Sequence, residues 1–170
     1  MVTHLLGKGA FGKVYLGELA GENEQYAIKS IRKDKLAAKP EVISNVFLEC
    51  NVLVKANHPF LANMQYFFAS EERLYFVMPF IGGGEMGKIL KIEDTFKEPV
   101  IKFYVTQLVL GLKYLHESNL MHRDLKLENL MVGKDGYLRI VDFGLAKILR
   151  PGQVSHTIVG TPAYFAPEIL

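Results

Sequence analysis

The residues best suited to chemistry in this sequence begin with a glycine-rich segment near its start. Leu6–Val14 reads Leu-Gly-Lys-Gly-Ala-Phe-Gly-Lys-Val, so Gly7, Gly9 and Gly12 follow the spacing G-x-G-x-x-G. Glycines let a backbone approach phosphate oxygens closely and offer them N–H groups. The same spacing opens a dinucleotide-binding turn, but only when a helix follows directly. Here a strand pattern follows, which favours a hairpin that covers phosphates.

A lysine and a glutamate further along could form an ion pair that holds a nucleotide phosphate. Lys29 lies in the strand-like run 26–31, where a lysine is usually a solvated edge residue. Residues 40–54 have helical spacing, and Glu49 falls on an otherwise apolar face of this helix, with Val42, Val46 and Leu53. A carboxylate in such a place needs a partner. We therefore predict that Glu49 pairs with Lys29 and directs its amine toward the α- and β-phosphates.

Three further short motifs that carry acidic side chains lie in the second half of the chain. Residues 122–129 read His-Arg-Asp-Leu-Lys-Leu-Glu-Asn, and Asp-Phe-Gly at 142–144 begins thirteen residues after Asn129. Ala-Pro-Glu follows at 166–168. Any one of these triplets could arise by chance. Their order after the glycine segment, Lys29 and Glu49 could not.

The composition excludes several classes of protein. The 170 residues are 49% apolar and 22% charged, which is typical of a globular protein and excludes disorder, collagen and coiled coil. The net charge is +2 without a basic tract, so nothing favours nucleic acid or a membrane surface as a partner. No apolar run approaches the ~18–20 residues of a membrane span, and the start lacks the features of a signal peptide. The single cysteine, Cys50, cannot form an internal disulfide, which favours a cytoplasmic location.

Several elements must position these side chains. Strands are predicted within residues 5–32, as an antiparallel hairpin, and at 64–69 and 74–78. The glycines at 82–84 predict a linker between two lobes. Residues 98–116 have the strongest helical pattern, with a predicted buried stripe of Ile101, Val105, Leu108, Leu112 and Leu115. Residues 120–141 are expected to hold loops and short strands, and 149–162 a loop.

These motifs together resemble the catalytic domain of eukaryotic protein kinases, over essentially the whole chain. Within that family the chain is most similar to the serine/threonine kinases of the AGC group, and Lys126 is typical of Ser/Thr specificity. His122, Leu127 and Pro79 depart from the usual AGC residues. The resemblance implies an α+β bilobal fold. It would have a five-stranded antiparallel N-lobe with one main helix at 1–81 and an incomplete, mainly helical C-lobe at 82–170. The hinge would lie near 78–84 and the activation segment at 142–168.

The resemblance also implies a role for each site residue. Asp124 would accept the proton of the substrate hydroxyl, Lys126 would steady the γ-phosphate, and Asn129 and Asp142 would hold Mg²⁺. ATP would be contacted by Leu6, the three glycines, Lys29 with Glu49 behind it, the adenine walls Val14, Ala27, Met131 and Val141, the hinge backbone at Phe80 and Ile81, and Glu85 at the ribose. The remaining implied residues are a phosphosite at Thr157 that faces Arg123, Thr161 bonded near Asp124 and Lys126, and Glu128, which with Glu85 would attract basic residues of a substrate.

The function implied is transfer of the γ-phosphate of ATP, with Mg²⁺, to Ser/Thr hydroxyls of protein substrates, with upstream basic residues preferred. An upstream activating kinase is an expected partner. The alternative is a naturally truncated, non-catalytic nucleotide-binding or scaffolding pseudokinase, although the catalytic positions hold the expected residues. Because the sequence ends two residues after Ala-Pro-Glu, we interpret it as a fragment. We expect the isolated chain to be unstable and to have little activity.

Overall fold

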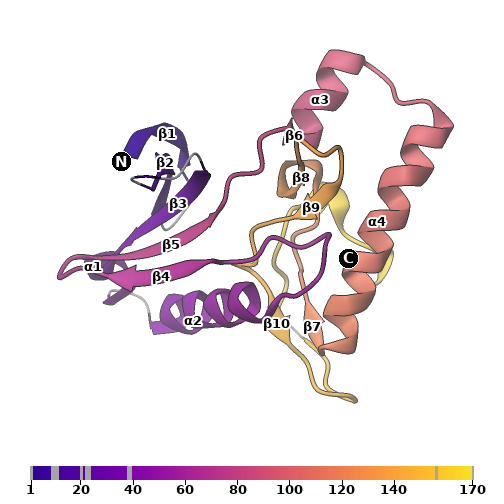
Figure 1. Cartoon of the computed structure of the whole chain (residues 1–170). Coiled ribbons are helices and arrows are strands. Elements are labelled where there is room, and N and C mark those ends of the chain that lie inside the picture. The colour runs from indigo at the N-terminus through magenta and orange to yellow at the C-terminus, as the bar shows by residue number, and fades with distance from the viewer. Residues whose placement is uncertain are drawn as a thin grey trace. The chain divides into compact units, whose positions relative to one another are not determined.

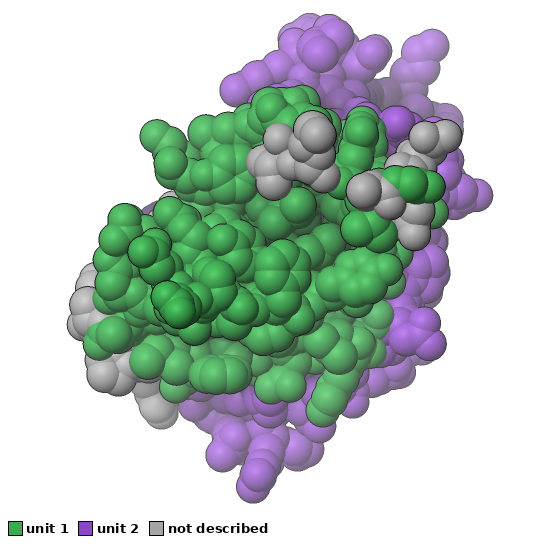
Figure 2. Space-filling view, turned by 60° about the vertical axis from the view of Figure 1, so that its left-hand side comes forward, with its two compact units in different colours: residues 1–56, 62–80 green, residues 57–61, 81–170 purple. Residues whose placement is uncertain are grey.

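The computed structural model describes residues 2–8, 12–19, 21, 24–37, 40–155 and 157–169, with only the backbone at 2, 40–42 and 45. These residues form two compact units, shown in two colours in Figure 2. Unit 1 comprises residues 1–56 and 62–80, and unit 2 comprises residues 57–61 and 81–170. The chain therefore passes to unit 2 after Phe80, and it also contributes a short earlier segment to that unit.

Unit 1 is built on a five-stranded sheet, which confirms the fold class predicted from the sequence (Figure 1). Its strands are β1 (Val2–Lys8), β2 (Gly12–Glu18), β3 (Gln25–Arg32), β4 (Tyr66–Ala69) and β5 (Arg73–Pro79), in the order β1-β2-β3-β5-β4. Every neighbouring pair is antiparallel. Ile31 on β3 and Phe76 on β5 are fully buried, so these two adjacent strands contribute to the core of the unit.

Two helices follow β3 in unit 1. α2 (Pro40–Lys55) begins at the predicted proline, and Val46, Glu49 and Leu53 on its predicted inward face are buried. The side chain of Val42 lies outside the described residues. α1 (Lys33–Ala37) is a single turn that the sequence did not predict, because a helix this short has no room for a periodic apolar pattern.

Unit 2 holds two longer helices and several short strands. The helices are α3 (Met86–Glu93) and α4 (Glu98–Glu117), of which only α4 was predicted. β6 (Gly84–Glu85), β8 (Leu130–Val132) and β9 (Leu138–Ile140) form one antiparallel sheet, and β7 (Leu120–Met121) pairs with β10 (Lys147–Ile148). Short 3₁₀ helices cover Leu127–Asn129, Pro162–Tyr164 and Pro167–Ile169. Gly84 thus begins a strand, so the prediction of a plain linker at 82–84 is wrong at this residue.

The buried face of α4 differs from the predicted apolar stripe. Leu115 is 2% exposed, but Ile101 is 47% exposed and Val105 is 48% exposed. The buried face instead runs through Gln107, Gly111 and Leu115. A Cβ on residue 111 would lie 2.9 Å from Cδ1 of Ile140 on β9, so the missing side chain lets helix and strand pack closely. Apolar periodicity missed this face because neither glycine nor glutamine counts as apolar. No described helix is long and apolar enough to cross a membrane.

Candidate active site

In unit 1, the predicted ion pair between strand and helix is present. Nζ of Lys29 on β3 lies 2.5 Å from Oε1 of Glu49 on α2. The Glu49 side chain is 5% exposed and the Lys29 side chain 19%, so the ammonium retains more contact with solvent than its partner. The pair gives the buried carboxylate the cation that its place on an apolar face requires.

The sheet register places the predicted adenine walls of unit 1 beside this lysine. Val14 on β2 is the cross-strand partner of Lys29, and Ala27 lies two residues before Lys29 on the same strand. Because cross-strand partners share a face and side chains alternate along a strand, all three belong to one face of the β2–β3 pair. Val14 and Ala27 are partly exposed, which leaves part of that face open to a ligand.

The glycine segment and the hinge are only partly described. Leu6 is exposed at the end of β1, Gly7 has open space around it, and Gly9 lies outside the described residues. A Cβ on Gly12 would lie 2.4 Å from the carbonyl oxygen of Ser30, so the close approach of β2 to β3 itself requires glycine here. At the predicted hinge, Phe80 donates its N–H to the Gln25 carbonyl at 2.9 Å. Of the backbone groups of Phe80, the carbonyl rather than the N–H is therefore available to hydrogen-bond a nucleotide.

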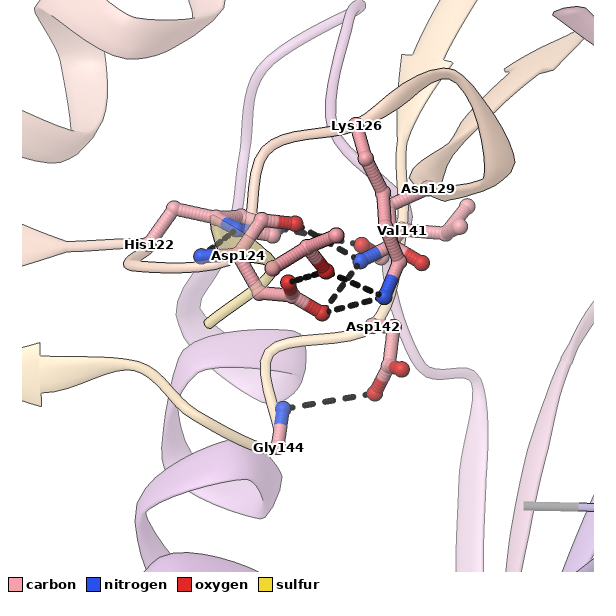
Figure 3. A network of polar contacts seen from close by, with 8 residues as sticks. His122, Asp124, Lys126, Asn129, Val141, Asp142 and Gly144 are labelled. Carbon is pink, nitrogen blue, oxygen red and sulfur yellow. Dashed lines mark hydrogen bonds and ion pairs between the residues drawn. The ribbon is translucent and has the colours of Figure 1, made fainter. Parts of the chain in front are cut away.

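In unit 2, the predicted catalytic residues meet at the carboxylate of Asp124 (Figure 3). Lys126 Nζ donates to Asp124 Oδ2 at 2.7 Å, and Asn129 Nδ2 donates to the same oxygen at 3.2 Å and to the Asp124 carbonyl at 2.8 Å. The hydroxyl of Thr161 donates to Asp124 Oδ1 at 2.7 Å and accepts from Lys126 at 3.2 Å. The activation-segment threonine is thus bonded to both residues that the sequence predicted for it.

The hydrogen bonds keep Asp124 ionised. Burial raises the pKa of Asp124, but donors from Lys126, Thr161 and Asn129 outweigh it and hold the pKa below its ordinary value. The same hydrogen bond from Lys126 to Asp124 raises the pKa of Lys126. At neutral pH the site therefore holds a carboxylate beside an ammonium.

A buried histidine orients the backbone around Asp124. His122 is 2% exposed, and desolvation lowers its pKa, so the ring is neutral. Its Nδ1 accepts the Asp124 N–H at 3.3 Å, which places the ring proton on Nε2, 3.1 Å from the Val141 carbonyl. One ring therefore ties the backbone of the Asp124 segment to the residue before Asp142. Arg123, which follows His122, and Asp142, which follows Val141, both have positive φ angles, of 66° and 60°.

Asn129, one of the two residues predicted to hold magnesium, shares a face of the β8–β9 hairpin with the predicted adenine-wall residues Met131 and Val141. Leu130 pairs with Ile140, and the Val141 N–H donates to the Asn129 carbonyl at 3.0 Å, so Asn129, Met131 and Val141 lie on the face opposite buried Leu130. Asp142 follows directly, with an exposed side chain and Oδ1 3.4 Å from the Gly144 N–H.

This donor set fits Mg²⁺ better than a metal held by the protein alone. Asn129 and Asp142 offer an amide oxygen and a carboxylate, and Mg²⁺ characteristically takes one or two such ligands together with waters and phosphate oxygens. Among the described residues, no group of three His, Cys, Asp or Glu side chains could hold a metal ion. Any Mg²⁺ here would need further ligands from water or from a bound nucleotide.

The other predicted residues of unit 2 do not contact the Asp124 network directly. Glu85 on β6 pairs with Lys88 at 3.1 Å, and Glu128 is exposed. Thr157 is also exposed. Arg123 donates to the Leu145 carbonyl at 2.7 Å and to the Ser155 hydroxyl at 3.4 Å, and the role predicted for Thr157 stays a prediction.

Comparison with known proteins agrees with the motifs. A family model described as protein kinase domain matches residues 1–170. The chain is 40% identical over its whole length to the "Probable serine/threonine-protein kinase" of Dictyostelium discoideum, and covers 37% of that protein. It is 45% identical over 98% of its length to RAC-beta serine/threonine-protein kinase of Homo sapiens and to RAC-beta serine/threonine-protein kinase A of Xenopus laevis, covering 34% of each. The chain thus spans about a third of these relatives. The RAC-beta match confirms the resemblance to the AGC group. The chain belongs to the protein kinase domain family.

Proposed function

We propose that this chain carries the ATP-binding and catalytic residues of a protein serine/threonine kinase, which transfers the γ-phosphate of ATP to Ser or Thr hydroxyls of proteins. The observation that carries this proposal is the Asp124 network, where an ionised carboxylate is hydrogen-bonded to Lys126, Asn129 and Thr161. A non-catalytic pseudokinase would have no need for this arrangement. The names of the relatives support the same activity.

Phosphoryl transfer depends mainly on positioning and on stabilising charge. In unit 1, Lys29 would contact the α- and β-phosphates, with Glu49 fixing its amine. In unit 2, Asn129 and Asp142 would hold Mg²⁺, which supplies positive charge near the γ-phosphoryl oxygens when bound. Asp124 would orient the attacking hydroxyl and accept its proton, and Lys126 would exchange its bond to Asp124 for one to the γ-phosphate.

Two carboxylates support a preference for basic substrates. Glu128 is exposed one residue before Asn129, and Glu85 is partly exposed on β6, the strand that pairs with β8. Arginine side chains of a substrate would find bidentate partners in such carboxylates. An oriented peptide array in which upstream Arg and Lys give no enrichment would contradict this preference.

Calorimetry with Mg·ATP tests the proposed nucleotide site without requiring turnover. We expect binding to the wild-type chain, and at least tenfold weaker binding after Asp142→Asn, because the mutation removes the only carboxylate proposed to ligate Mg²⁺. Asp94→Asn is a matched control, since Asp94 is exposed at the end of α3 with φ of 62°, which asparagine tolerates. Wild-type protein without Mg·ATP affinity would overturn the proposal. Transfer of ³²P to a basic peptide that survives Asp124→Asn would overturn the role of Asp124.

We also propose that the chain alone has little activity and low stability. Large apolar side chains are exposed along α4, at Val100, Ile101, Phe103, Val105, Val109 and Leu110. An apolar surface of this extent favours association over a stable monomer. A monomer by size-exclusion chromatography that melts sharply and phosphorylates a peptide would contradict this expectation.

The single cysteine of the sequence, Cys50, is not in a disulfide, and this supports an intracellular location.

A further inference from the structure

The first turn of α3 in unit 2 holds two residues that the stability of the helix does not explain. Gly87 and Lys88 occupy this turn, which contains no acidic residue, and the buried residue of the helix is Met86. Glycine inside a helix is unfavourable compared with alanine. A lysine near the N-terminus of a helix faces the positive end of the helix dipole. Two local preferences are thus broken side by side, which points to a role outside the helix itself.

Gly87 and Lys88 flank the carboxylate of Glu85, the last residue of β6. Nζ of Lys88 lies 3.1 Å from Oε2 of Glu85. A Cβ on residue 87 would lie 3.5 Å from the other oxygen, Oε1, and 3.4 Å from Cβ of Leu127, which begins a 3₁₀ helix. Both distances are ordinary contacts, so the packing does not require glycine here. Residue 87 instead leaves the space beside Oε1 without a side chain of its own.

The ion pair compensates the charge of Glu85 without removing it from water. The side chain of Lys88 is 74% exposed and that of Glu85 is 24% exposed. Exposed ion pairs of this kind are weak and open readily. Glu128, the other carboxylate proposed to attract basic substrates, has no described cation within ion-pair distance. Among the described residues, Glu85 is therefore the one of these two acids that already has a cation beside it.

We propose that Lys88 is a specificity-determining residue, which competes with the basic side chains of a substrate for Glu85. This inference rests on the proposed function, and it adds that the two acids contribute unequally to the preference for basic residues. A bidentate contact with a guanidinium group uses both oxygens of a carboxylate. While Lys88 is paired with Oε2, an arginine of the substrate finds one of these oxygens engaged and the charge of Glu85 compensated. The arginine must displace Lys88, which weakens the preference at Glu85.

A purely structural role for the ion pair predicts a different result. A glutamate three residues before a lysine stabilises a helix slightly. If this were the whole role, removal of Lys88 would lower the melting temperature and would not change how strongly an arginine is preferred over a neutral residue. Competition for Glu85 predicts that the same removal increases this preference. The ratio of two peptide affinities therefore distinguishes the two roles, because a change in stability alone affects both affinities equally.

Fluorescence anisotropy with two labelled peptides tests the proposal without requiring turnover. In one peptide arginines precede a serine, and in the other citrullines take their places, with nearly the same shape but no charge. We expect Lys88→Gln to increase the ratio of the two affinities about two- to fivefold, as for the loss of one exposed ion pair. The double variant Glu85→Gln/Lys88→Gln should lose this gain, and Lys88→Glu should exceed it. Lys91→Gln is the matched control, because it removes the same charge from an exposed lysine of α3 that has no described ion pair.

An equal gain for Lys91→Gln would reveal a general effect of charge and would overturn the proposal. So would an unchanged ratio in Lys88→Gln, or a gain that persists in the double variant. Should Lys88→Gln fail to fold by circular dichroism, Lys88→Glu carries the same test. Peptides that bind to no variant would also overturn the proposal, because a specificity-determining residue must act on binding. Mg·ATP binding by the same wild-type sample would distinguish that failure from a failure of the proposed function.

Discussion

A single buried glutamine carries a hydrogen bond that joins α4 to the β8–β9 hairpin beside the candidate active site. Gln107 is 4% exposed. Its Oε1 accepts the Leu138 N–H at 2.7 Å, and its Nε2 donates to the Phe103 carbonyl at 3.2 Å. Gln107→Met keeps the length of the side chain but removes both groups. The Leu138 N–H at the start of β9 is then buried without a partner, which costs about 1–3 kcal/mol.

Urea unfolding followed by circular dichroism measures this loss. We expect a lower midpoint with an unchanged slope, and a melting temperature lower by about 2–4 °C for each kcal/mol in a chain of this size. Gln65→Met is the matched control, because Gln65 is exposed and only its backbone N–H is bonded, to the Val77 carbonyl.

The site of the loss is identified by amide hydrogen exchange. Exchange of the Leu138 N–H should become about 5- to 160-fold faster in Gln107→Met, which corresponds to the same free energy. Equal midpoints for Gln107→Met and Gln65→Met, with unchanged exchange at Leu138, would show that this bond contributes nothing, and would refute the reasoning that a buried donor must be paired.

Three further predictions concern the residues around Asp124. Burial lowers the pKa of His122, so this histidine binds a proton more readily in the unfolded chain than in the folded one, and stability should fall as pH decreases below about 6.5. His122 can contribute a slope of at most about 1.4 kcal/mol per pH unit. The unfolding midpoints at pH 7.5 and 5.5 should therefore differ less in His122→Tyr than in wild type, while His116→Gln, at an exposed position, should leave the difference as it is in wild type. Gly160→Ala should destabilise the chain by about 1–3 kcal/mol, since φ is 114° and a Cβ would lie 2.4 Å from the Arg123 carbonyl oxygen. Gly152→Ala, where φ is 83° and the space is open, should destabilise it less. A smaller shift of the urea unfolding midpoint for Gly160→Ala than for Gly152→Ala would contradict this. Thr161→Val removes one of the donors that hold the pKa of Asp124 down, so ¹³C NMR of the Asp124 carboxyl should show a higher pKa, and the stability that this carboxylate contributes above about pH 4 should decrease.

Contacts between the candidate residues could be predicted where chemistry demanded a partner or where one short segment carries several of them. Glu49 on an apolar helix face indicated a buried partner, and the structure pairs it with Lys29. The segment 122–129 places Asp124, Lys126 and Asn129 within six residues, so a single loop conformation brings them together. Chemical need alone predicted the Lys29–Glu49 pair, whereas the roles of Asp124, Lys126 and Asn129 were implied by the resemblance to protein kinases.

Contacts that depend on small or polar residues far apart in the chain could not be predicted from the sequence. Gln107 and Leu138 are 31 residues apart, and no periodicity marks a glutamine as buried. Ser155 and Lys147 are polar residues in a segment without regular pattern, so only the β7–β10 pairing brings Lys147 to the serine. Ile101 on α4 was predicted to be buried but is exposed. The reason is the same, since counting apolar residues cannot detect that Gly111 determines which face of α4 packs against the strand.

The activation segment contacts the residues at 122–129 at two places that flank one glycine. Ser155 is held by Arg123 and Lys147, and Thr161 donates to Asp124. Between them Gly160 approaches the carbonyl oxygen of Arg123 so closely that no side chain fits. Because Arg123 and Asp124 are consecutive, a side chain at residue 160 would push the segment away from both residues at once. We therefore expect Gly160→Ala to weaken the hydrogen bond from the Thr161 hydroxyl to Asp124 and so to raise the pKa of the Asp124 carboxyl, which ¹³C NMR would follow. An unchanged pKa would show that this hydrogen bond does not depend on the close approach at Gly160.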